Sequence, residues 1–475
     1  MNAQIGIIGL AVMGANIARN IASREIEVSV YNRTTERMTE LIEAHGNQYL
    51  RGYEELKDFV ESIERPRAII ILVQAGPAVD AVIESLKPLL DKDDIIVECG
   101  NSYYKDTERR FNDLKELGIN FFGCGVSGGE EGALRGPSLM PGGHKPSYER
   151  LKPILEAIAA KDFQGDPCVT YCGEGPAGHY VKMVHNGIEY GVMQLIAEAY
   201  QILKQHFDLS AKEIGDIFEH YNQGVLKSFL FEIAAEVLHQ EDEFNEGYLI
   251  DYILDKAGQK GTGKWTAVDA LDRGIPTPTI TAAVDARIMS SFKDKRVELS
   301  KLFNSFELLD DWPLEQFAPV LEGALFIAMI CSYAQGYHLI ETASQEEGWG
   351  VDLSEASRIW QGGCIIRADI LKIFTEAFIN AKPGMHLFEI PEITQLLNPE
   401  DDYKGYQNLR DVVILATESG VAIPCLSASL AYFDTMTKER CSASMIQGLR
   451  DNFGAHTYQR TDREGSFHTD WLANK

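Results

Sequence analysis

The sequence lacks the cysteine and histidine patterns of a metal site or a disulfide framework. None of its eight cysteines forms a CxxC pair, and no HExxH segment or Cys/His cluster has the spacing of a zinc site. A chain of 475 residues, 45% hydrophobic, is long enough to bury a large core without such crosslinks. We therefore expect reduced, buried thiols and no bound metal.

Basic residues and targeting signals are also scarce. The 44 Lys and Arg residues face 71 Asp and Glu residues, and the net charge of −27 argues against a nucleic-acid surface. No basic residue precedes Arg19, which is atypical of a secretory or mitochondrial signal. No apolar run approaches the roughly 20 residues that a membrane-spanning helix needs. We expect a cytoplasmic protein without nucleic-acid or membrane partners, in which any anionic ligand is held by a local cluster of cations.

The first 33 residues have the order strand, glycine turn, helix, strand. QIGIIG is a short apolar strand, residues 15–22 have a helical pattern, and EVSVYNR is a second strand. Gly9 permits a tight turn, Gly14 allows close packing of helix and strand, and Ala11 stands where a second glycine is usual. Free N–H groups at the start of the helix favour an anion. The unit predicts a dinucleotide site in a Rossmann-like α/β domain.

The end of the second strand selects the cofactor. NAD-dependent enzymes usually place Asp or Glu there, whereas this chain has Asn32-Arg33-Thr34. A carboxylate repels a 2′-phosphate, and a guanidinium binds it through two hydrogen bonds. Unless Arg33 is only a solvated turn residue, the segment predicts NADP.

Three further apolar segments predict strands of the same sheet. They are RAIIILV (67–73), DIIVECGNS (94–102) and NFFGCGVSGG (120–129). Near-continuous apolar runs are typical of parallel strands covered by helices on both faces. Ligands bind beyond the carboxyl ends of such strands, where Gln74, Asn101 and Ser127 lie.

The part of the chain from about residue 177 to about residue 440 has mainly helical patterns, and two of them recur. YGVMQLIAE (190–198) aligns with YAQGYHLIE (333–341), and residues 221–226 align with residues 360–365. These matches predict two related helical bundles.

A phosphate-binding P-loop is an alternative for GQKGTGKW (258–265), which nearly matches GxxxxGK[ST]. Trp265 replaces the hydroxyl residue that would bind Mg²⁺, and the preceding LIDYILDKA reads as a helix rather than a buried strand. The loop can still bind an anion through Lys260 and its backbone N–H groups.

The segment VKMVHNGIEY (181–190) carries polar residues at helical spacing. Five of them fall within an arc of roughly 140° on one helix face: Lys182, His185, Asn186, Glu189 and Tyr190. This spacing normally marks a buried apolar stripe. Taken alone, the segment is either a solvated face or a reactive one.

The chain resembles the decarboxylating 6-phosphogluconate dehydrogenase family over essentially its whole length. The resemblance is carried by IGLAVMG, NRT, CGNS, VSGGEEGA, VKMVHNGIEYG, ILDKAGQKGTGKWT, WQGGCIIR, RDNFGAH and SFHTDW. It implies a Rossmann-like domain (1–176), an all-helical substrate and dimerisation domain of two related bundles (177–439), and a tail (440–475) that enters the partner subunit of a homodimer. The implied reaction converts 6-phosphogluconate and NADP⁺ to ribulose 5-phosphate, CO₂ and NADPH in the pentose phosphate pathway.

The resemblance also implies residue roles. Lys182 would be the general base and Glu189 the general acid. The implied cofactor residues are Gly9, Leu10, Ala11, Val12, Met13, Gly14, Asn32, Arg33, Thr34, Val73, Gln74, Ala75 and Asn101. The implied substrate residues are Asn101, Ser127, Gly128, Gly129, His185, Asn186, Tyr190, Lys260 and Arg287, with Arg450 and His456 reaching in from the partner chain.

The sequence departs from the family pattern at four positions. Gln74 replaces a lysine near the cofactor, Val192 an aspartate, Asp285 an aromatic residue and Tyr221 a tryptophan. Two other functions remain as alternatives. A different β-hydroxyacid dehydrogenase would typically be shorter with one helical bundle, and a non-catalytic NADPH-binding module would not need an amine and a carboxyl group on one helix face.

The tail is polar enough to be disordered. We instead expect three of its aromatic side chains to anchor it on the partner subunit: Phe453, Phe467 and Trp471.

Overall fold

A seven-stranded sheet forms the first part of the chain. The computed structural model describes residues 2–303, 312–398 and 405–471, and it separates into two units, residues 1–429 and 430–475. In the first unit the strand order is β3-β2-β1-β4-β5-β6-β7, and only β6 and β7 pair antiparallel. The strands are β1 (Ile5–Ile8), β2 (Val28–Tyr31), β3 (Leu50–Tyr53), β4 (Ala68–Ile71), β5 (Ile95–Glu98), β6 (Asn120–Ser127) and β7 (Ser138–Gly143).

The five strands expected from the sequence are confirmed, whereas β3 and β7 were not predicted. β3 is an edge strand of four residues in which only Leu50 is buried. β7 contains Pro141 and two glycines, a composition that indicates a loop. It is a strand because it pairs with β6 along its whole length, from Phe122–Gly143 to Ser127–Ser138. The sheet is therefore parallel except at this edge.

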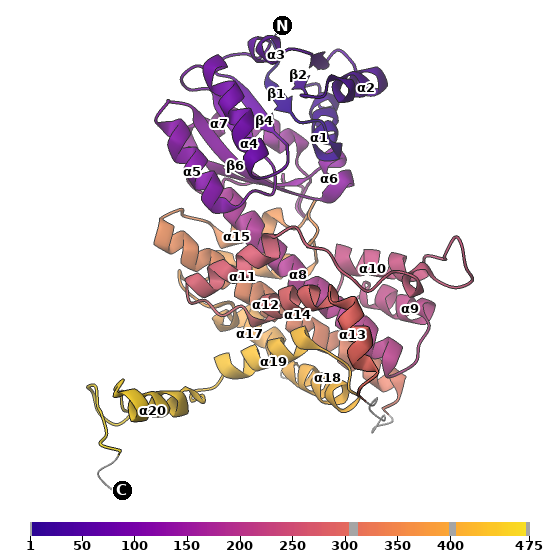
Figure 1. Ribbon diagram of the computed structural model, residues 1–475, viewed down its shortest axis with the longest axis vertical. Coiled ribbons are helices and arrows are strands. Elements are labelled where there is room, and N and C mark those ends of the chain that lie inside the picture. Colours follow the sequence, from indigo (N-terminus) through magenta and orange to yellow (C-terminus); the bar gives the residue numbers. More distant parts are fainter. Residues whose placement is uncertain (1, 304–311, 399–404, 472–475) are drawn as a thin grey trace. The chain divides into compact units, whose positions relative to one another are not determined.

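Helices cover both faces of the sheet (Figure 1). Alternation along β4 shows why: Ile70 faces one apolar cluster, and Ile69 and Ile71 face the other. The first cluster includes residues of α1 (Val12–Ser23), α2 (Thr35–His45), α6 (Gly129–Arg135) and α7 (Lys145–Ile158). The second includes residues of α3 (Leu56–Glu61), α4 (Pro77–Leu86) and α5 (Tyr104–Lys115). This arrangement confirms the Rossmann-like prediction.

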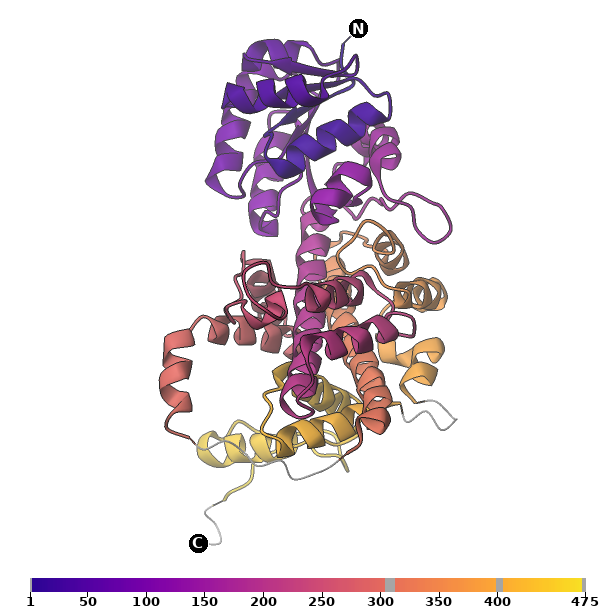
Figure 2. The same ribbon diagram turned by 90° about the vertical axis from the view of Figure 1, so that its right-hand side faces the viewer.

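Two long helices form the centre of the helical part, α8 (Ala177–Gln205) and α14 (Leu314–Glu347). They pack against each other, and Figure 2 shows α8 running from the sheet domain into the helical part. Each is followed by two shorter helices: α9 (Ala211–Tyr221) and α10 (Phe229–His239) after α8, and α15 (Leu353–Ile359) and α16 (Ile370–Asn380) after α14. Ser228 and Ala368, which precede α10 and α16, form a β-bridge. The order of helices agrees with two related bundles.

Helix α14 corrects the expectation that no segment is apolar enough for a membrane. Its most apolar 18-residue window has a mean hydropathy of 1.7, so by length and composition alone the helix could cross a membrane. Of this window, 78% is buried inside the protein. Its polar Gln335 is also satisfied internally, because its amide oxygen accepts from Thr279 N at 3.0 Å and its amide nitrogen donates to Thr279 Oγ1 at 2.9 Å. These contacts are those of a core helix in the helical part.

The other helices of the helical part before α19 are α11 (Thr262–Asp272), α12 (Pro278–Ser290), α13 (Lys293–Ser300), α17 (Pro391–Leu397) and α18 (Tyr406–Glu418), with the short 3₁₀ turns η2 (Leu249–Asp251) and η3 (Leu387–Glu389). A further 3₁₀ turn, η1 (Lys87–Leu89), follows α4 in the sheet domain. The prediction of a helix just before the 258–265 loop is wrong, because residues 249–257 contain only the 3₁₀ turn η2.

The second unit begins within α19 (Pro424–Met436) and contains α20 (Ala443–Gly454). Its chain folds around the buried carboxylate of Asp451, which accepts from His468 Nδ1 at 2.9 Å, Thr469 N at 3.1 Å and Trp471 Nε1 at 2.8 Å. Tyr458 and Phe467 add a β-bridge. The described tail is therefore folded, in contrast to the disordered alternative.

Candidate functional site

The glycine turn after β1 has no room for side chains at Gly9 and Gly14. Gly9 has φ +97°, and a β-carbon there would meet the Leu72 carbonyl oxygen. A β-carbon on Gly14 would meet the Gly9 carbonyl oxygen. Helix α1 begins after Ala11, and within the described chain no side chain caps it. Its first N–H groups are therefore left for an anion.

A cavity of about 1030 Å³ opens at this turn. It is lined by all the predicted cofactor residues except Arg33 and Thr34: Gly9, Leu10, Ala11, Val12, Met13, Gly14, Asn32, Val73, Gln74, Ala75 and Asn101. Tyr103 also lines it, and the helical part contributes Lys260 and Trp265. The cavity wall is thus built from both parts of the first unit.

An adjoining cavity of about 350 Å³ contains Arg33 and Thr34, together with Asn32. Asn32 Oδ1 accepts from Leu10 N at 2.9 Å, so its side chain ties the end of β2 to the glycine turn. Arg37 lines both cavities and was missed by sequence reasoning. Its position in the sequence could have indicated it, because Arg37 lies in the first turn of α2, four residues after Arg33. Two arginines and no described carboxylate therefore line this smaller cavity, and a guanidinium can bind a phosphate through two hydrogen bonds.

The polar face of α8 is buried, so the solvated alternative for residues 181–190 is wrong. Lys182, His185 and Asn186 are all buried, and the Glu189 side chain is 20% exposed. Gly125 on β6 makes this packing possible, because a β-carbon there would meet the side chain of Lys182. The start of α8 therefore lies directly against the sheet.

His185 is the centre of a buried hydrogen-bond network. Its Nδ1 lies 2.9 Å from Asn186 Oδ1, which can only accept, so Nδ1 carries the proton. Its Nε2 then accepts, and it lies 3.2 Å from Ser127 Oγ and 2.8 Å from Cys364 Sγ. Ser127 Oγ in turn accepts from Ile365 N at 3.3 Å. In this tautomer Ser127 and Cys364 share the single lone pair of Nε2.

Lys182 and Glu189 approach the same ring atom of His185. Lys182 Nζ lies 3.4 Å from Nδ1, and Glu189 Oε2 lies 3.9 Å from it. Burial lowers the pKa of Lys182, with Glu189 opposing, and burial raises the pKa of Glu189, with Lys182 and Arg287 opposing. The environment therefore favours a neutral amine and a protonated carboxyl group. These are the forms of a general base and a general acid.

The other predicted substrate residues come from several elements. Ser127 ends β6, and Gly128 and Gly129 begin α6. Tyr190 packs on Gly263 of α11, and the Arg287 guanidinium lies 3.5 Å from the centre of its ring. Lys260 and Asn101 line the larger cavity.

Arg450 and His456 belong to the second unit, and their role in the site stays a prediction. Arg450 Nη1 donates to Gln447 Oε1 at 3.0 Å within α20. The His456 ring lies 5.9 Å from the Phe453 ring.

Sequence reasoning also missed Cys364. Its thiol is buried beside His185, and burial raises its pKa to about 11. It therefore stays protonated and can donate to His185 Nε2. Its position could have indicated it, because Cys364 lies in WQGGCIIR, one of the segments that carry the family resemblance, to which no role was assigned.

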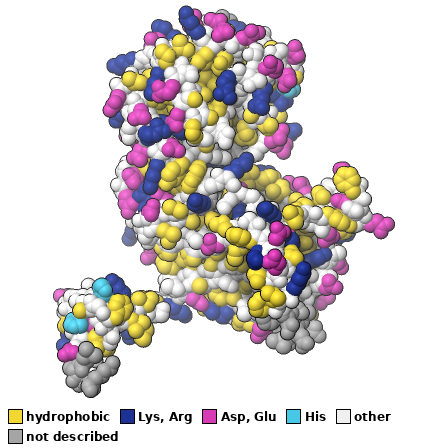
Figure 3. Space-filling model, in the orientation of Figure 1, with side chains coloured by type: hydrophobic (Ala, Val, Ile, Leu, Met, Phe, Trp, Pro, Cys, Tyr) yellow, Lys and Arg dark blue, Asp and Glu magenta, His cyan; other side chains and the backbone are white. Residues whose placement is uncertain are grey.

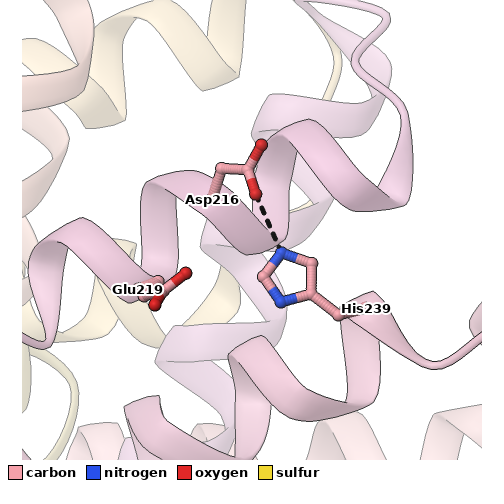
Figure 4. A group of neighbouring side chains, drawn as sticks. All are labelled: Asp216, Glu219 and His239. Carbon is pink, nitrogen blue, oxygen red and sulfur yellow. Dashed lines mark hydrogen bonds and ion pairs between the residues drawn. The ribbon is translucent and has the colours of Figure 1, made fainter.

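One group among the described residues has metal-ligand spacing, Asp216, Glu219 and His239 on α9 and α10 (Figure 4). Asp216 already pairs with His239 Nε2 at 3.0 Å and with Lys212 Nζ at 2.7 Å. This cluster contains none of the predicted site residues and is explained by ion pairing. The expectation of no bound metal stays a prediction.

Two family models match the chain. "NAD binding domain of 6-phosphogluconate dehydrogenase" matches residues 4–173, and "6-phosphogluconate dehydrogenase, C-terminal domain" matches residues 178–471. The chain belongs to the 6-phosphogluconate dehydrogenase family. Since both regions match, this family is favoured over a β-hydroxyacid dehydrogenase with one bundle.

Relatives in the 6-phosphogluconate dehydrogenase family match the chain over nearly its full length. The NADP(+)-dependent, decarboxylating 6-phosphogluconate dehydrogenase of Bacillus subtilis is 50% identical, with 99% of both chains covered. The decarboxylating enzyme of Escherichia coli K12 is 48% identical, again with 99% of both covered. The structure of the Plasmodium falciparum 6-phosphogluconate dehydrogenase, which was studied with NADP⁺ and with 6-phosphogluconate, has a TM-score of 0.93 at 44% identity and covers 98% of this chain and 100% of its own.

Proposed function

We propose that this protein oxidises and decarboxylates 6-phosphogluconate to ribulose 5-phosphate and CO₂ and reduces NADP⁺, a step of the pentose phosphate pathway. The observation that carries the proposal is the pairing of Lys182 and Glu189 across His185, on a helix that begins against the sheet. Burial shifts the pKa values of the two groups in opposite directions. The cavity with Arg33 and Arg37 supplies the cation pair that NADP needs.

The chemistry of the pair uses the neutral forms toward which burial shifts both groups. When bound, NADP⁺ would supply the acceptor for the hydride that leaves C3 of the sugar acid. Lys182, as the neutral amine, takes the proton of the C3 hydroxyl. The product is a β-keto acid, and Lys182, now an ammonium, stabilises the enolate that forms as CO₂ leaves. Glu189 then donates its proton to C1 of the enediol.

The spacing on α8 suits two ends of one small substrate. Lys182 and Glu189 are seven residues apart, which places their Cα atoms about 10 Å apart along the helix. His185 and Asn186 lie between them along the helix, and His185 Nδ1 lies 2.9 Å from Asn186 Oδ1. We propose that these two residues, with Ser127, Gly128, Gly129, Tyr190, Lys260 and Arg287, bind the sugar acid.

An absorbance assay for NADPH tests the function. The protein is incubated with 6-phosphogluconate and either NADP⁺ or NAD⁺. NADPH formation with release of one CO₂ per NADPH supports the proposal. Binding of NADP⁺ without turnover would instead support the non-catalytic module, and turnover without CO₂ would support a different β-hydroxyacid dehydrogenase.

We also infer a homodimer in which the tail of each subunit completes the site of the other. Apolar side chains are exposed on the helical part around α12 and α13 (Figure 3): Ile253, Leu254, Met289, Phe292, Leu302 and Phe303. Such a surface is typical of a protein interface. The proposed divisions are residues 1–176, 177–439 and 440–475, and the proposed compartment is the cytoplasm, with no nucleic-acid or membrane partner.

A further inference from the structure

A buried carboxylate joins three helices beside the cofactor cavity. Asp269 on α11 is 2% exposed. Its Oδ1 accepts from the Tyr104 hydroxyl of α5 at 2.6 Å, and its Oδ2 accepts from the Tyr180 hydroxyl of α8 at 2.6 Å. Arg273 Nε also donates to Oδ2 at 2.9 Å, which balances the charge. All the partners of this carboxylate are therefore short, direct donors.

The two tyrosine bonds differ in what they connect. Tyr180 and Asp269 both lie in the helical part, on α8 and α11. Tyr104 is the first residue of α5 and belongs to the sheet domain. The Tyr104–Asp269 bond therefore crosses between the cofactor domain and the helical part, whereas the Tyr180–Asp269 bond stays within the helical part.

The Tyr104–Asp269 hydrogen bond lies next to residues that line the cofactor cavity. Asn101 and Tyr103, just before Tyr104, line the cavity, and so do Lys260 and Trp265, which lie in the loop before α11 and in its first turn. The Tyr103 and Trp265 rings lie 5.0 Å apart. The sheet domain and the helical part thus meet at these two rings. The adjacent hydrogen bond between Tyr104 and Asp269 holds the two segments together.

Further hydrogen bonds hold the helical side of this contact. Arg273 is bonded to Glu346 and, at 3.0 Å, to Glu347 at the end of α14. Thr266 Oγ1 donates to Met183 O of α8 at 2.8 Å. Because α11 is fixed in this way, loss of the Tyr104 hydroxyl would free the cofactor-domain side of the wall rather than α11.

We propose that Asp269 is a positioning residue for the cofactor. Through Tyr104 it holds the Asn101–Tyr103 segment against Trp265, so that the cavity is shaped before NADP⁺ binds. The inference rests on the proposed function for the identity of the cofactor. A shaped cavity binds more tightly because the apparent Kd rises as the binding-competent fraction of molecules falls.

The test compares Tyr104→Phe with Tyr180→Phe. Each variant keeps its ring and removes one hydroxyl bond to the same carboxylate, and Tyr104→Phe also removes the longer contact from Arg273 Nη2 at 3.5 Å. We expect Tyr104→Phe to raise the Kd for NADP⁺, measured by calorimetry, and the KM for NADP⁺ about tenfold, with kcat within about twofold of wild type. We expect Tyr180→Phe to leave both constants within about twofold although its Tm falls by a similar amount.

Equal changes in Kd for the two variants, or no change in either, would show that Asp269 is only structural. The calorimetric comparison does not depend on turnover. Absence of NADPH formation by the wild-type protein would reject the proposed function, while the ratio of the two Kd values would still decide the role of Asp269.

Discussion

The Nζ atom of Lys182 lies 3.4 Å from Nδ1 of His185, the ring nitrogen that carries the proton. An ammonium group would place its own hydrogens against this N–H, whereas a neutral amine can accept from it. The geometry and the burial that lowers the Lys182 pKa therefore act in the same direction. His185 is itself kept neutral, because burial holds its pKa well below the usual value.

The first prediction concerns Lys182→Met. A base must be deprotonated, so activity should rise with pH through the lowered pKa of Lys182 and give an acidic limb in the profile of log kcat/KM. The variant should lose this limb, and kcat should fall about 10²- to 10⁴-fold. Steady-state kinetics across pH measure both effects. Lys212→Met, which removes a surface lysine, should behave as wild type, and near-normal turnover in Lys182→Met would remove Lys182 from the mechanism.

The second prediction concerns Glu189→Gln. An acid must be protonated, so activity should fall as pH rises through the raised pKa of Glu189. The amide keeps the shape but has no proton to donate to C1. We expect kcat to fall at least about 100-fold while the KM for the sugar acid changes little. The exposed Glu236→Gln serves as control. An unchanged kcat would contradict the role of Glu189 as the general acid.

Local sequence patterns located part of the candidate site, and the family resemblance supplied the rest. Three features could be recognised from residues that are close together in the sequence: the glycine turn, Asn32 to Thr34, and the polar face of α8. The five apolar strands were equally readable, because a parallel strand is buried on both faces. The segment 181–190 could not be called reactive from its own pattern, since the same spacing suits a solvated face. Its burial depends on Gly125, which is far away in sequence.

What the sequence did not predict depends on pairing between distant segments. β7 is a strand only because β6 lies beside it. Cys364 acquires its role from His185, and Asp269 from Tyr104, contacts that join residues far apart in the chain. The long apolar run in α14 was overlooked because Glu322 and its later polar residues interrupt the pattern.

The third prediction concerns cofactor choice. Arg33→Ala and Arg37→Ala should each raise the KM for NADP⁺ about tenfold or more, because a hydrogen bond to a charged group contributes roughly 1.5–3 kcal/mol. Kinetics with NAD⁺, which has no 2′-phosphate, should stay the same and provide the control. An equal loss with both cofactors would mean that these arginines support the turn rather than bind the phosphate.

The fourth prediction concerns the tail. Removal of residues 441–475 should raise the KM for the sugar acid sharply, because Arg450 and His456 would no longer reach the partner's site. Light scattering gives the oligomeric state of the same sample. Arg450→Ala in the full-length chain separates loss of contact with the substrate from loss of the dimer. Unchanged kinetics in the truncated protein would contradict tail exchange.

Glu198 sets a pH dependence of stability outside the site. It lies on α8 and is 1% exposed. Its carboxylate oxygens accept from Cys425 N at 2.8 Å and from Leu426 N at 2.9 Å at the start of α19. Burial raises its pKa to about 7, with these backbone N–H groups opposing. The charged form is therefore less stable in the folded protein than in the unfolded chain.

The fifth prediction follows from the sign of this shift. Because the folded-state pKa of about 7 exceeds the ordinary 4.5, the stability contributed by protonated Glu198 is full below pH 4.5 and is lost as pH rises through 7. The loss amounts to about 3 kcal/mol. Glu198→Gln cannot ionise, so its free energy of unfolding, measured with urea from about pH 4.5 to about pH 8, should fall less than that of wild type. Glu236→Gln should keep the wild-type slope, and parallel curves for wild type and Glu198→Gln would contradict the assignment.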